Sequence, residues 1–486
     1  LSFCQECKFV NQHEVEILAG NETSPRLIKS KSFLIATGAS PIVPNQLEED
    51  AKAANVPIYT YRTLLEPEGD LTIWQMLNQS SSSKPNIVLV GGGATACELG
   101  QALARLGSDW NVTIVAPSIL PTEDAMLQNA ALKLLTGDRI NVLQGRRVTN
   151  IRNSSPRATV VLSDDSEIPV DALVMCAGRS PGVGLEALNL EAAGVSWSTN
   201  EGVIVKKSTL QSKTTPNIYA CGDCASVVSG DDRRAAHGAW TGFHVARNLA
   251  VPWILRAGSQ STHPFVPRVT YTDPEMASVG MSHSECVKRF GSSGFVSISA
   301  PEEGMDRADM ERLERPTFGF VELRATKIGG HILGMTACGP AAAELANEIG
   351  VALHNKLTVR DIAKSMHSYP SHGYLLHRIA LAMAMGGTLG ALDVLGPGGR
   401  FVASLGRFVW RSSDAVASIS PFRRRRMRRL RKWEYEGSSQ SIATANGVVT
   451  SFLDIHMNSA LNNHTAQFID DSKDSKYHEW VGRQPH

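Results

Sequence analysis

The chain has 486 residues, 42% of them hydrophobic and 20% charged, a composition typical of a soluble globular protein with about three domains. The net charge is only +1, but positions 423–432 hold eight Arg or Lys residues and no acid, so the rest of the chain carries −7. Glycines and Asp393 interrupt the most apolar stretch, at 379–395, which argues against a transmembrane helix because such a helix needs about 18 uncharged apolar residues.

The first 62 residues predict mainly strands. The alternating stretch Glu14–Leu18 predicts a half-buried strand, and the apolar Phe33–Ile35 predicts a strand that runs into a turn at Ala36–Gly38. A serine run at 80–83, followed by Pro85, is typical of a linker into a second domain.

The next stretch alternates strands and helices. An apolar strand from Asn86 precedes a helix at Ala94–Leu106, a strand at Val112–Val115 and a helix at Glu123–Leu135, with β segments across 140–175. This alternation predicts a parallel sheet with right-handed crossovers.

A glycine turn joins the first of these strands to its helix. Gly91 permits a tight turn, Gly93 lets the backbone approach a pyrophosphate, and Ala96 is small enough for the helix to pack on the strand. The N-terminus of the helix offers free amides and a positive dipole end to phosphates. The pattern predicts a dinucleotide site.

A second nucleotide signature follows at Asn217–Asp223. Its strand ends at Gly222 and Asp223, where the carboxylate can accept a hydrogen bond from a ribose or ribitol hydroxyl. A lone glycine turn is weak evidence for nucleotide binding, but two nucleotide signatures in this order are strong evidence for it. A helix is predicted at Arg234–Leu249.

The last folded region begins with alternating strands from Val269. Leu345, Ile349, Leu353 and Leu357 are spaced by four and predict one apolar helix face. Thr358 is predicted to cap a further helix with Asp361 three residues on, and Leu357 and Ile362 are placed as a hydrophobic staple. Beyond about residue 433 the composition predicts a disordered tail.

Together with Phe33–Pro41 and Ala172–Pro181, the two nucleotide segments resemble the pyridine nucleotide-disulfide oxidoreductases, a family that includes lipoamide dehydrogenase, glutathione reductase and mercuric reductase. Val269–Gly280 resembles the opening of the family's dimer-interface domain, and His367–Pro370 its closing active-site motif. The motifs follow one another in the family's order across residues 31–380. The resemblance is closest to the mercuric reductase-like members, which have a tyrosine at the position of Tyr369.

The resemblance implies an α/β fold with two Rossmann-like domains, for FAD and NAD(P)H, and an α+β dimerisation domain. We expect 1–64 to be a partial FAD-binding domain, 65–182 the NAD(P)-binding domain and 183–264 the second part of the FAD-binding domain. Residues 265–385 then form the dimerisation domain, and 386–486 a basic, largely disordered extension.

Two parts of the family pattern do not occur in the sequence. No glycine fingerprint, which in the family binds the ADP half of FAD, precedes Lys31. The family's redox pair, two cysteines separated by four residues on the helix after that fingerprint, is not found either. Since the chain also begins with Leu1, we interpret the sequence as truncated at its N-terminus. A variant that has lost both features is the alternative.

The resemblance implies a set of site residues. Those expected to bind FAD or NAD(P)H are Thr37, Gly38, Gly91, Gly93, Ala96, Glu98, Gly178, Arg179, Gly222, Asp223 and His237. Those expected to act in catalysis are Tyr369, His367 and Glu98.

Each expected catalytic residue also has a plainer interpretation. In the family, the glutamate at the position of Glu98 pairs with a lysine near the redox cysteines, and here Glu98 would have no such partner. The plainer interpretation is that Glu98 complements the helix dipole. Tyr369 stands where lipoamide dehydrogenases have a histidine base, and Tyr374 where they have its glutamate, so the resemblance argues against dithiol substrates. Packing at the interface is the alternative for Tyr369 and His367.

The preference between NADH and NADPH stays open. The acid that normally follows the fingerprint by about 20 residues is not found, because the second strand ends at Ala116–Ser118. We therefore expect little discrimination. We predict no metal site: Cys97, Cys176 and Cys221 are expected to be buried hydrophobes, and the pair Cys4/Cys7 is left as an alternative metal or redox site.

The sequence thus predicts an FAD-dependent NAD(P)H oxidoreductase, mercuric reductase-like and homodimeric, that acts on a disulfide or metal ion. The alternatives are a membrane-associated flavin NADH dehydrogenase that uses quinone, and a catalytically dead nucleotide-binding protein. The basic run 423–432 is interpreted as a solvated tail, as a contact to an anionic membrane, or, third, as a nucleic-acid contact. We expect an intracellular protein, soluble or peripheral to a membrane.

Overall fold

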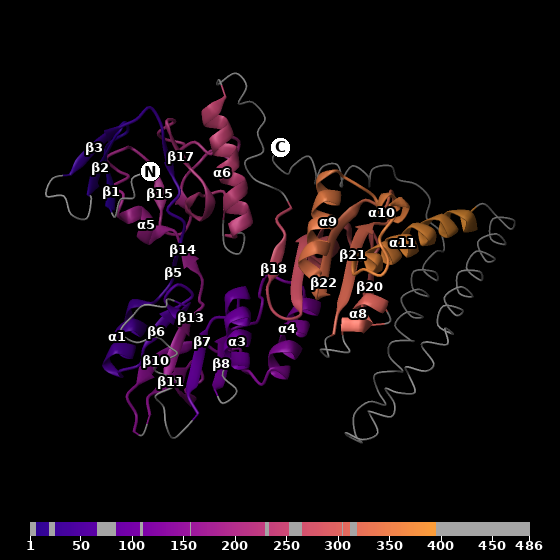
Figure 1. Cartoon of the computed structure of the whole chain (residues 1–486), viewed down its shortest axis with the longest axis horizontal. Helices are drawn as coiled ribbons and strands as arrows, with labels where there is room; N and C mark the ends of the chain where they lie inside the picture. The colour runs from indigo at the N-terminus through magenta and orange to yellow at the C-terminus, as the bar shows by residue number, and fades with distance from the viewer. Residues whose placement is uncertain are drawn as a thin grey trace.

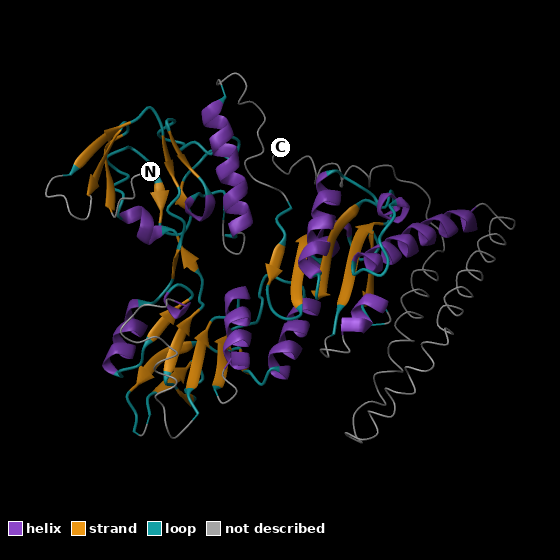
Figure 2. Cartoon of the chain, viewed as in Figure 1, coloured by secondary structure: helices purple, strands orange, loops and turns teal. Residues whose placement is uncertain are grey.

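The computed structural model describes residues 6–18, 25–65, 84–106, 110–155, 157–228, 233–251, 265–303, 305–311 and 318–394. These residues form three units; two lie at the left of the view, one above the other, and the third lies beside them (Figure 1). Each unit combines strands with helices (Figure 2), which confirms the predicted α/β class.

The first unit is built from two separate passages of the chain. β1 (Glu6–Asn11), β2 (Glu14–Leu18) and β3 (Arg26–Lys29) form an antiparallel meander, and β4 (Phe33–Ile35) pairs in parallel with β17 (Ile218–Ala220). The second passage also contributes α5 (Gly182–Glu186), β15 (Trp197–Ser198), β16 (Gly202–Val203) and α6 (Ala235–Ala250). The strands predicted at Glu14–Leu18 and Phe33–Ile35 are confirmed.

The second unit contains a five-stranded parallel sheet, as predicted. Its order is β6 (Ile58–Thr60), β13 (Ala172–Met175), β7 (Asn86–Val90), β8 (Asn111–Ala116) and β9 (Asn141–Gln144). The helices are α1 (Asn45–Ala53), α3 (Ala94–Leu106) and α4 (Ala125–Gly137). A meander of β10 (Val148–Arg152), β11 (Thr159–Leu162) and β12 (Glu167–Pro169) packs against α1.

The boundary between these units differs from the expected one. β6 pairs with β13, so residues 45–60 belong to the second unit and not to a first domain that ends at residue 64. The chain passes between the units at β5 (Ser40–Pro41), which pairs with β14 (Arg179–Ser180) (Figure 1). The serine run at 80–83 had suggested that the chain enters the second unit later. Its composition indicates a loop, but it carries no information on which strands pair in a sheet.

The third unit has a five-stranded antiparallel sheet. Its order is β18 (Arg268–Thr270), β19 (Glu275–Gly280), β22 (Ile332–Gly339), β21 (Phe320–Thr326) and β20 (Phe295–Pro301). The helices are α7 (His283–Phe290), α8 (Asp306–Glu311), α9 (Ala342–His354), α10 (Val359–Lys364) and α11 (Gly373–Val394). α11 runs past residue 385, where we expected the domain to end.

Two of the predicted helices differ in detail from the observed ones. α4 starts two residues later than expected, because Asp124 has extended backbone and lies at the N-cap position. α9 ends at His354, so Leu357 lies beyond it, after Lys356 turns the chain with φ of 56°. The predicted cap of α10 is confirmed: the Asp361 carboxylate accepts hydrogen bonds from the amide (2.8 Å) and hydroxyl (2.7 Å) of Thr358.

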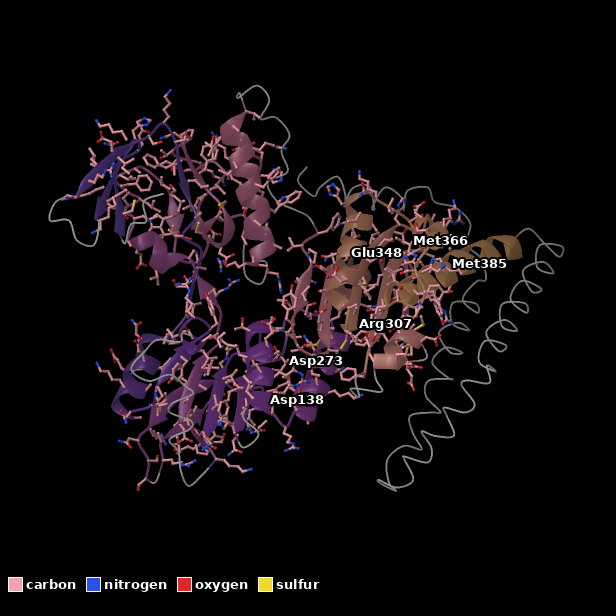
Figure 3. The ribbon with its side chains drawn as sticks, viewed as in Figure 1. Asp138, Asp273, Arg307, Glu348, Met366 and Met385 are labelled. Carbon is pink, nitrogen blue, oxygen red and sulfur yellow. The ribbon has the colours of Figure 1, made fainter. Side chains whose placement is uncertain are left out.

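Side chains of α3 and the N-terminus of α4 hold the second unit against the third. Arg105 donates to Asp273 Oδ2 at 2.7 Å and to Asp138 Oδ1 at 3.2 Å, and Figure 3 shows these two acids side by side at the junction. Glu123 binds Arg268 at 2.9 Å. These contacts give the nucleotide helix a fixed position relative to the third unit.

Within the described residues no helix is long and apolar enough to cross a membrane. Cys4, the predicted tail and the basic run 423–432 lie outside the described residues.

Candidate active site

The glycine turn after β7 has the geometry of a phosphate cradle. Gly91 has φ of 118°, and a Cβ atom there would lie 2.3 Å from the carbonyl oxygen of Cys176, so only glycine fits. A Cβ atom on Gly93 would meet no atom within 4 Å, which leaves this backbone open to a ligand. The hydrogen bonds of α3 start with the Ala96 amide on Gly93 O at 3.0 Å, so the preceding amides face outward. These features suit a dinucleotide phosphate.

Ala96 has the packing role that its small size predicted. Its exposure is 0%, and the nearby Gly100 brings α3 against Ile114 of β8, since a Cβ atom there would lie 3.0 Å from Ile114 Cδ1. The glycine turn is therefore held close to the end of the sheet.

Glu98 lies on the second turn of α3, so the alternative role as a first-turn complement to the helix dipole is wrong. Its Oε1 accepts a hydrogen bond from the backbone amide of Tyr271 at 2.8 Å. Burial raises the pKa of the Glu98 carboxyl. The hydrogen bond from Tyr271 and the charge of Arg234 lower it, but by less than burial raises it. Glu98 thus links the nucleotide helix to the segment between β18 and β19.

A second cluster forms where β4 and β17 end together. Their parallel pairing brings Thr37 and Gly38 beside Gly222, and both glycines have positive φ, 70° and 68°. The Gly222 amide donates to Thr241 Oγ1 of α6 at 2.9 Å. A Cβ atom on Gly222 would lie 3.6 Å from Gly238 Cα, so the first turn of α6, with the buried His237, closes on this turn.

Asp223 carries the negative charge of this cluster. Its Oδ2 accepts from Arg179 at 2.8 Å, and Gly178, with φ of 115°, turns the chain just before that arginine. The charge of Arg233 also acts on this carboxylate, but among the described residues Asp223 accepts no other hydrogen bond, so Oδ1 is open to a hydroxyl donor. Arg233 donates to the Arg179 carbonyl oxygen at 3.1 Å, and this fixes the loop that carries the ion pair. The cluster fits the ribitol end of a flavin nucleotide.

The cysteines near the two nucleotide turns, Cys97, Cys176, Cys221 and Cys224, are thiols of low reactivity. Burial raises the pKa of Cys97 and Cys176 to about 12 each, and of Cys221 to about 11. Cys224 donates to the carbonyl oxygens of Ile35 (3.4 Å) and Cys221 (3.2 Å). These cysteines contribute to packing, as expected for Cys97 and Cys221, whereas Cys176 is only partly buried.

The His367–Pro370 motif lies on the outer part of the third unit. His367 Nε2 is 3.0 Å from Glu348 Oε1, a contact that sequence spacing did not reveal. The Tyr369 hydroxyl donates to Asp306, which raises the pKa of Tyr369, and this side chain is 60% exposed. Met366, next to the motif, lies on the side of this unit away from α3 and α6 (Figure 3). Within one chain the motif therefore does not join the other two clusters.

His372 completes this region and was missed by the sequence analysis. Its Nε2 is 3.3 Å from Glu311 and its Nδ1 is 3.7 Å from Glu302, a buried carboxylate. Glu302 first, and then Glu311, raise the pKa of His372 against the effect of burial. No local pattern could have indicated this trio, since β20, α8 and α11 bring the three residues together.

The comparisons with known proteins agree with this arrangement. Residues 3–248 match the family described as pyridine nucleotide-disulphide oxidoreductase, and residues 266–379 match its dimerisation domain. A mercuric reductase of Acidithiobacillus ferrooxidans is 27% identical over 365 residues, which are 75% of this chain and 60% of that protein. An NAD(P)H dehydrogenase (quinone) of Mycobacterium tuberculosis is 26% identical, with 70% and 62% covered. The chain thus spans about three fifths of the length of these relatives.

Solved structures show the same fold. LpdA of Mycobacterium tuberculosis superposes with a TM-score of 0.61 at 23% identity, covering 78% of this chain and 76% of that one. The Cu(II) complex of the HOCl-induced flavoprotein disulfide reductase RclA of Escherichia coli has a TM-score of 0.63 at 20% identity, with 77% of each chain covered. The chain belongs to the pyridine nucleotide-disulphide oxidoreductase family.

Proposed function

We propose that this protein is an FAD-dependent NAD(P)H oxidoreductase that passes electrons from the nicotinamide to a disulfide or metal-ion substrate. The observation that carries the proposal is that α3 and α6, the helices beside the two nucleotide turns, are both hydrogen-bonded to the same short segment, residues 269–271. The Arg234 guanidinium at the start of α6 donates to Val269 O at 2.8 Å, and Val269 is two residues from the Tyr271 amide that binds Glu98.

The chain's own residues supply binding and orientation. The amides at the start of α3 bind the diphosphate of the nicotinamide nucleotide, and Gly91 keeps that turn closed on the sheet. Asp223 accepts a ribitol hydroxyl while Arg179 holds its second oxygen. When bound, FAD supplies the hydride and electron chemistry, which the side chains themselves do not perform.

The motif at 367–370 serves the site of the neighbouring subunit in the proposed homodimer. Tyr369 is well exposed, Met366 is fully exposed and Val351 of α9 is 63% exposed, which suits a face covered by a second copy. A two-fold symmetric pairing is the commonest closed arrangement of soluble oligomers.

The acceptor is tested by oxidation of NADPH and NADH in FAD-supplemented protein with mercuric ion, a disulfide or a quinone. A metal-ion or disulfide acceptor is supported if turnover falls at least about 10-fold in Tyr369→Phe. Turnover with quinone alone, unaffected by that change, supports the second candidate, an NAD(P)H dehydrogenase that uses quinone. That candidate is favoured by Cys97 and Cys176 beside the glycine turn, whose high pKa values make them poor thiolates.

The shared site is tested by mixing Tyr369→Phe subunits with Gly93→Asp subunits. If Tyr369 acts across the interface, a mixed dimer has one site with both defects and one with neither, so activity recovers partway. No recovery despite subunit exchange, or a monomer by light scattering, contradicts the assembly.

A further inference from the structure

The loop after β9 lies beside the loop after β8. The two strands pair in parallel and end together, with Ala116 opposite Gln144. Beyond their ends, the Gly145 amide donates to Pro117 O at 3.0 Å, and the Ile119 amide donates to Gln144 Oε1 at 3.3 Å. Both loops therefore occupy the carboxyl edge of the sheet, where a dinucleotide bound to α3 extends its adenosine.

The loop after β8 also contacts the glycine turn directly. The Leu120 amide donates to Gly92 O at 2.7 Å, and a Cβ atom on Gly92 would lie 2.1 Å from Ser118 O. The end of β8 itself offers no charge to a ribose: Ala116 is buried, and Pro117 and Ser118 follow. Any charged contact to the 2′ position has to come from a neighbouring segment.

Two arginines follow β9 at this edge. Gly145, with φ of 74°, turns the chain into Arg146 and Arg147. Arg146 Nε pairs with Asp164 at 2.7 Å. Arg147 is exposed, and its backbone is fixed by two hydrogen bonds with Ser163, at 3.2 and 2.9 Å. Within the part of the chain that the structure describes, its guanidinium has no acidic partner.

The spacing of the strands lets these side chains reach the end of β8. Neighbouring strands are about 4.8 Å apart, less than the length of an extended arginine side chain. A guanidinium presents a planar fork of donors that matches a phosphate, whereas a ribose hydroxyl gains little from it. We infer that Arg147, flanked by Arg146, binds the 2′-phosphate of the nucleotide, so that the protein prefers NADPH to NADH. This inference rests on the proposed nucleotide site.

The test is calorimetric titration of the full chain with NADPH and NADH, and with adenosine 2′,5′-bisphosphate and ADP as probes without nicotinamide. We expect NADPH to bind more tightly than NADH, and Arg147→Gln to weaken NADPH and the bisphosphate about 10- to 100-fold. NADH and ADP should change by less than about twofold. The matched control is Arg139→Gln, which removes an exposed arginine just before β9, at the opposite edge of the sheet, and should leave all four affinities unchanged.

The outcomes separate this inference from the site on which it rests. If NADPH and NADH bind equally well and Arg147→Gln changes neither, the inference is wrong and the nucleotide site stands. An equal loss for both nucleotides in Arg147→Gln also overturns it, since the arginine would then contact a group that both share. If no nucleotide binds the unaltered chain, the proposed site fails, and the inference with it.

Discussion

Replacing Gly93 by aspartate should separate the stability of α3 from its ability to bind a nucleotide. Gly93 precedes the helix and has open space where a side chain would begin. Aspartate is favoured over glycine at an N-cap by a few tenths of a kcal/mol, and a negative charge at a helix N-terminus adds about 0.3–1 kcal/mol. Gly93→Asp should therefore fold at least as well as the unaltered chain.

Binding should change in the opposite direction. The new carboxylate would lie where the diphosphate approaches, and two like charges 4 Å apart repel by about 4 kcal/mol at an effective dielectric constant of about 20. Even half of that energy weakens binding about 30-fold. Thermal unfolding gives the stability, and calorimetry with NADPH gives the affinity.

The matched control is Gly93→Asn, which has nearly the same shape, caps the helix and carries no charge. It should bind NADPH more tightly than Gly93→Asp does. If Gly93→Asp unfolds more readily, the capping argument is wrong; if it binds NADPH as tightly as the unaltered chain, the assignment of this turn to a phosphate is refuted.

The other predictions concern charges of the site and core. Asp223→Asn should weaken FAD about 10-fold in a fluorescence titration, since a neutral amide accepts the ribitol hydroxyl less strongly; equal affinity would refute the role of this carboxylate. Arg324→Met should lower the free energy of unfolding in urea by about 3–5 kcal/mol, because Arg324 is buried and binds Glu322 at 2.6 Å. Arg307 (labelled in Figure 3) forms an exposed pair with Glu311, so Arg307→Met should lower it by less than about 1 kcal/mol. Because the pKa of His372 is raised, its ion pairs stabilise the fold below the unfolded pKa of about 6.5, and this effect is lost as the pH rises through the folded pKa. His372→Gln should therefore lower the free energy of unfolding more at about pH 6 than at about pH 9. A difference that does not depend on pH would contradict the ion pairs.

The sequence predicted those parts of the fold that are encoded locally. The bounds of α3 and the cap of α10 followed from a glycine turn and from one Thr–Asp spacing, because the atoms involved lie within a few residues of one another. The end of α9 was missed, since leucines spaced by four continue past the point where Lys356 turns the chain.

Contacts between distant segments were beyond local reasoning. The partner of Glu98 is a backbone amide of the third unit, and the partner of His367 is Glu348 on α9. In the sequence, only the residues at the end of β8 could be assigned to the nucleotide preference. The structure adds the loop after β9, because parallel strands bring the ends of successive segments to one edge.

The central claim is that this chain holds a nicotinamide nucleotide and a flavin so that electrons pass between them. Anaerobic mixing of the FAD-supplemented protein with NADPH, followed by the visible absorbance of the flavin, measures that transfer without any acceptor substrate. We expect rapid bleaching in the unaltered chain and, at an NADPH concentration well below the weakened dissociation constant, bleaching slowed about 30-fold in Gly93→Asp. A chain that binds both nucleotides and leaves the flavin absorbance unchanged would contradict electron transfer between them and indicate a catalytically dead nucleotide-binding protein.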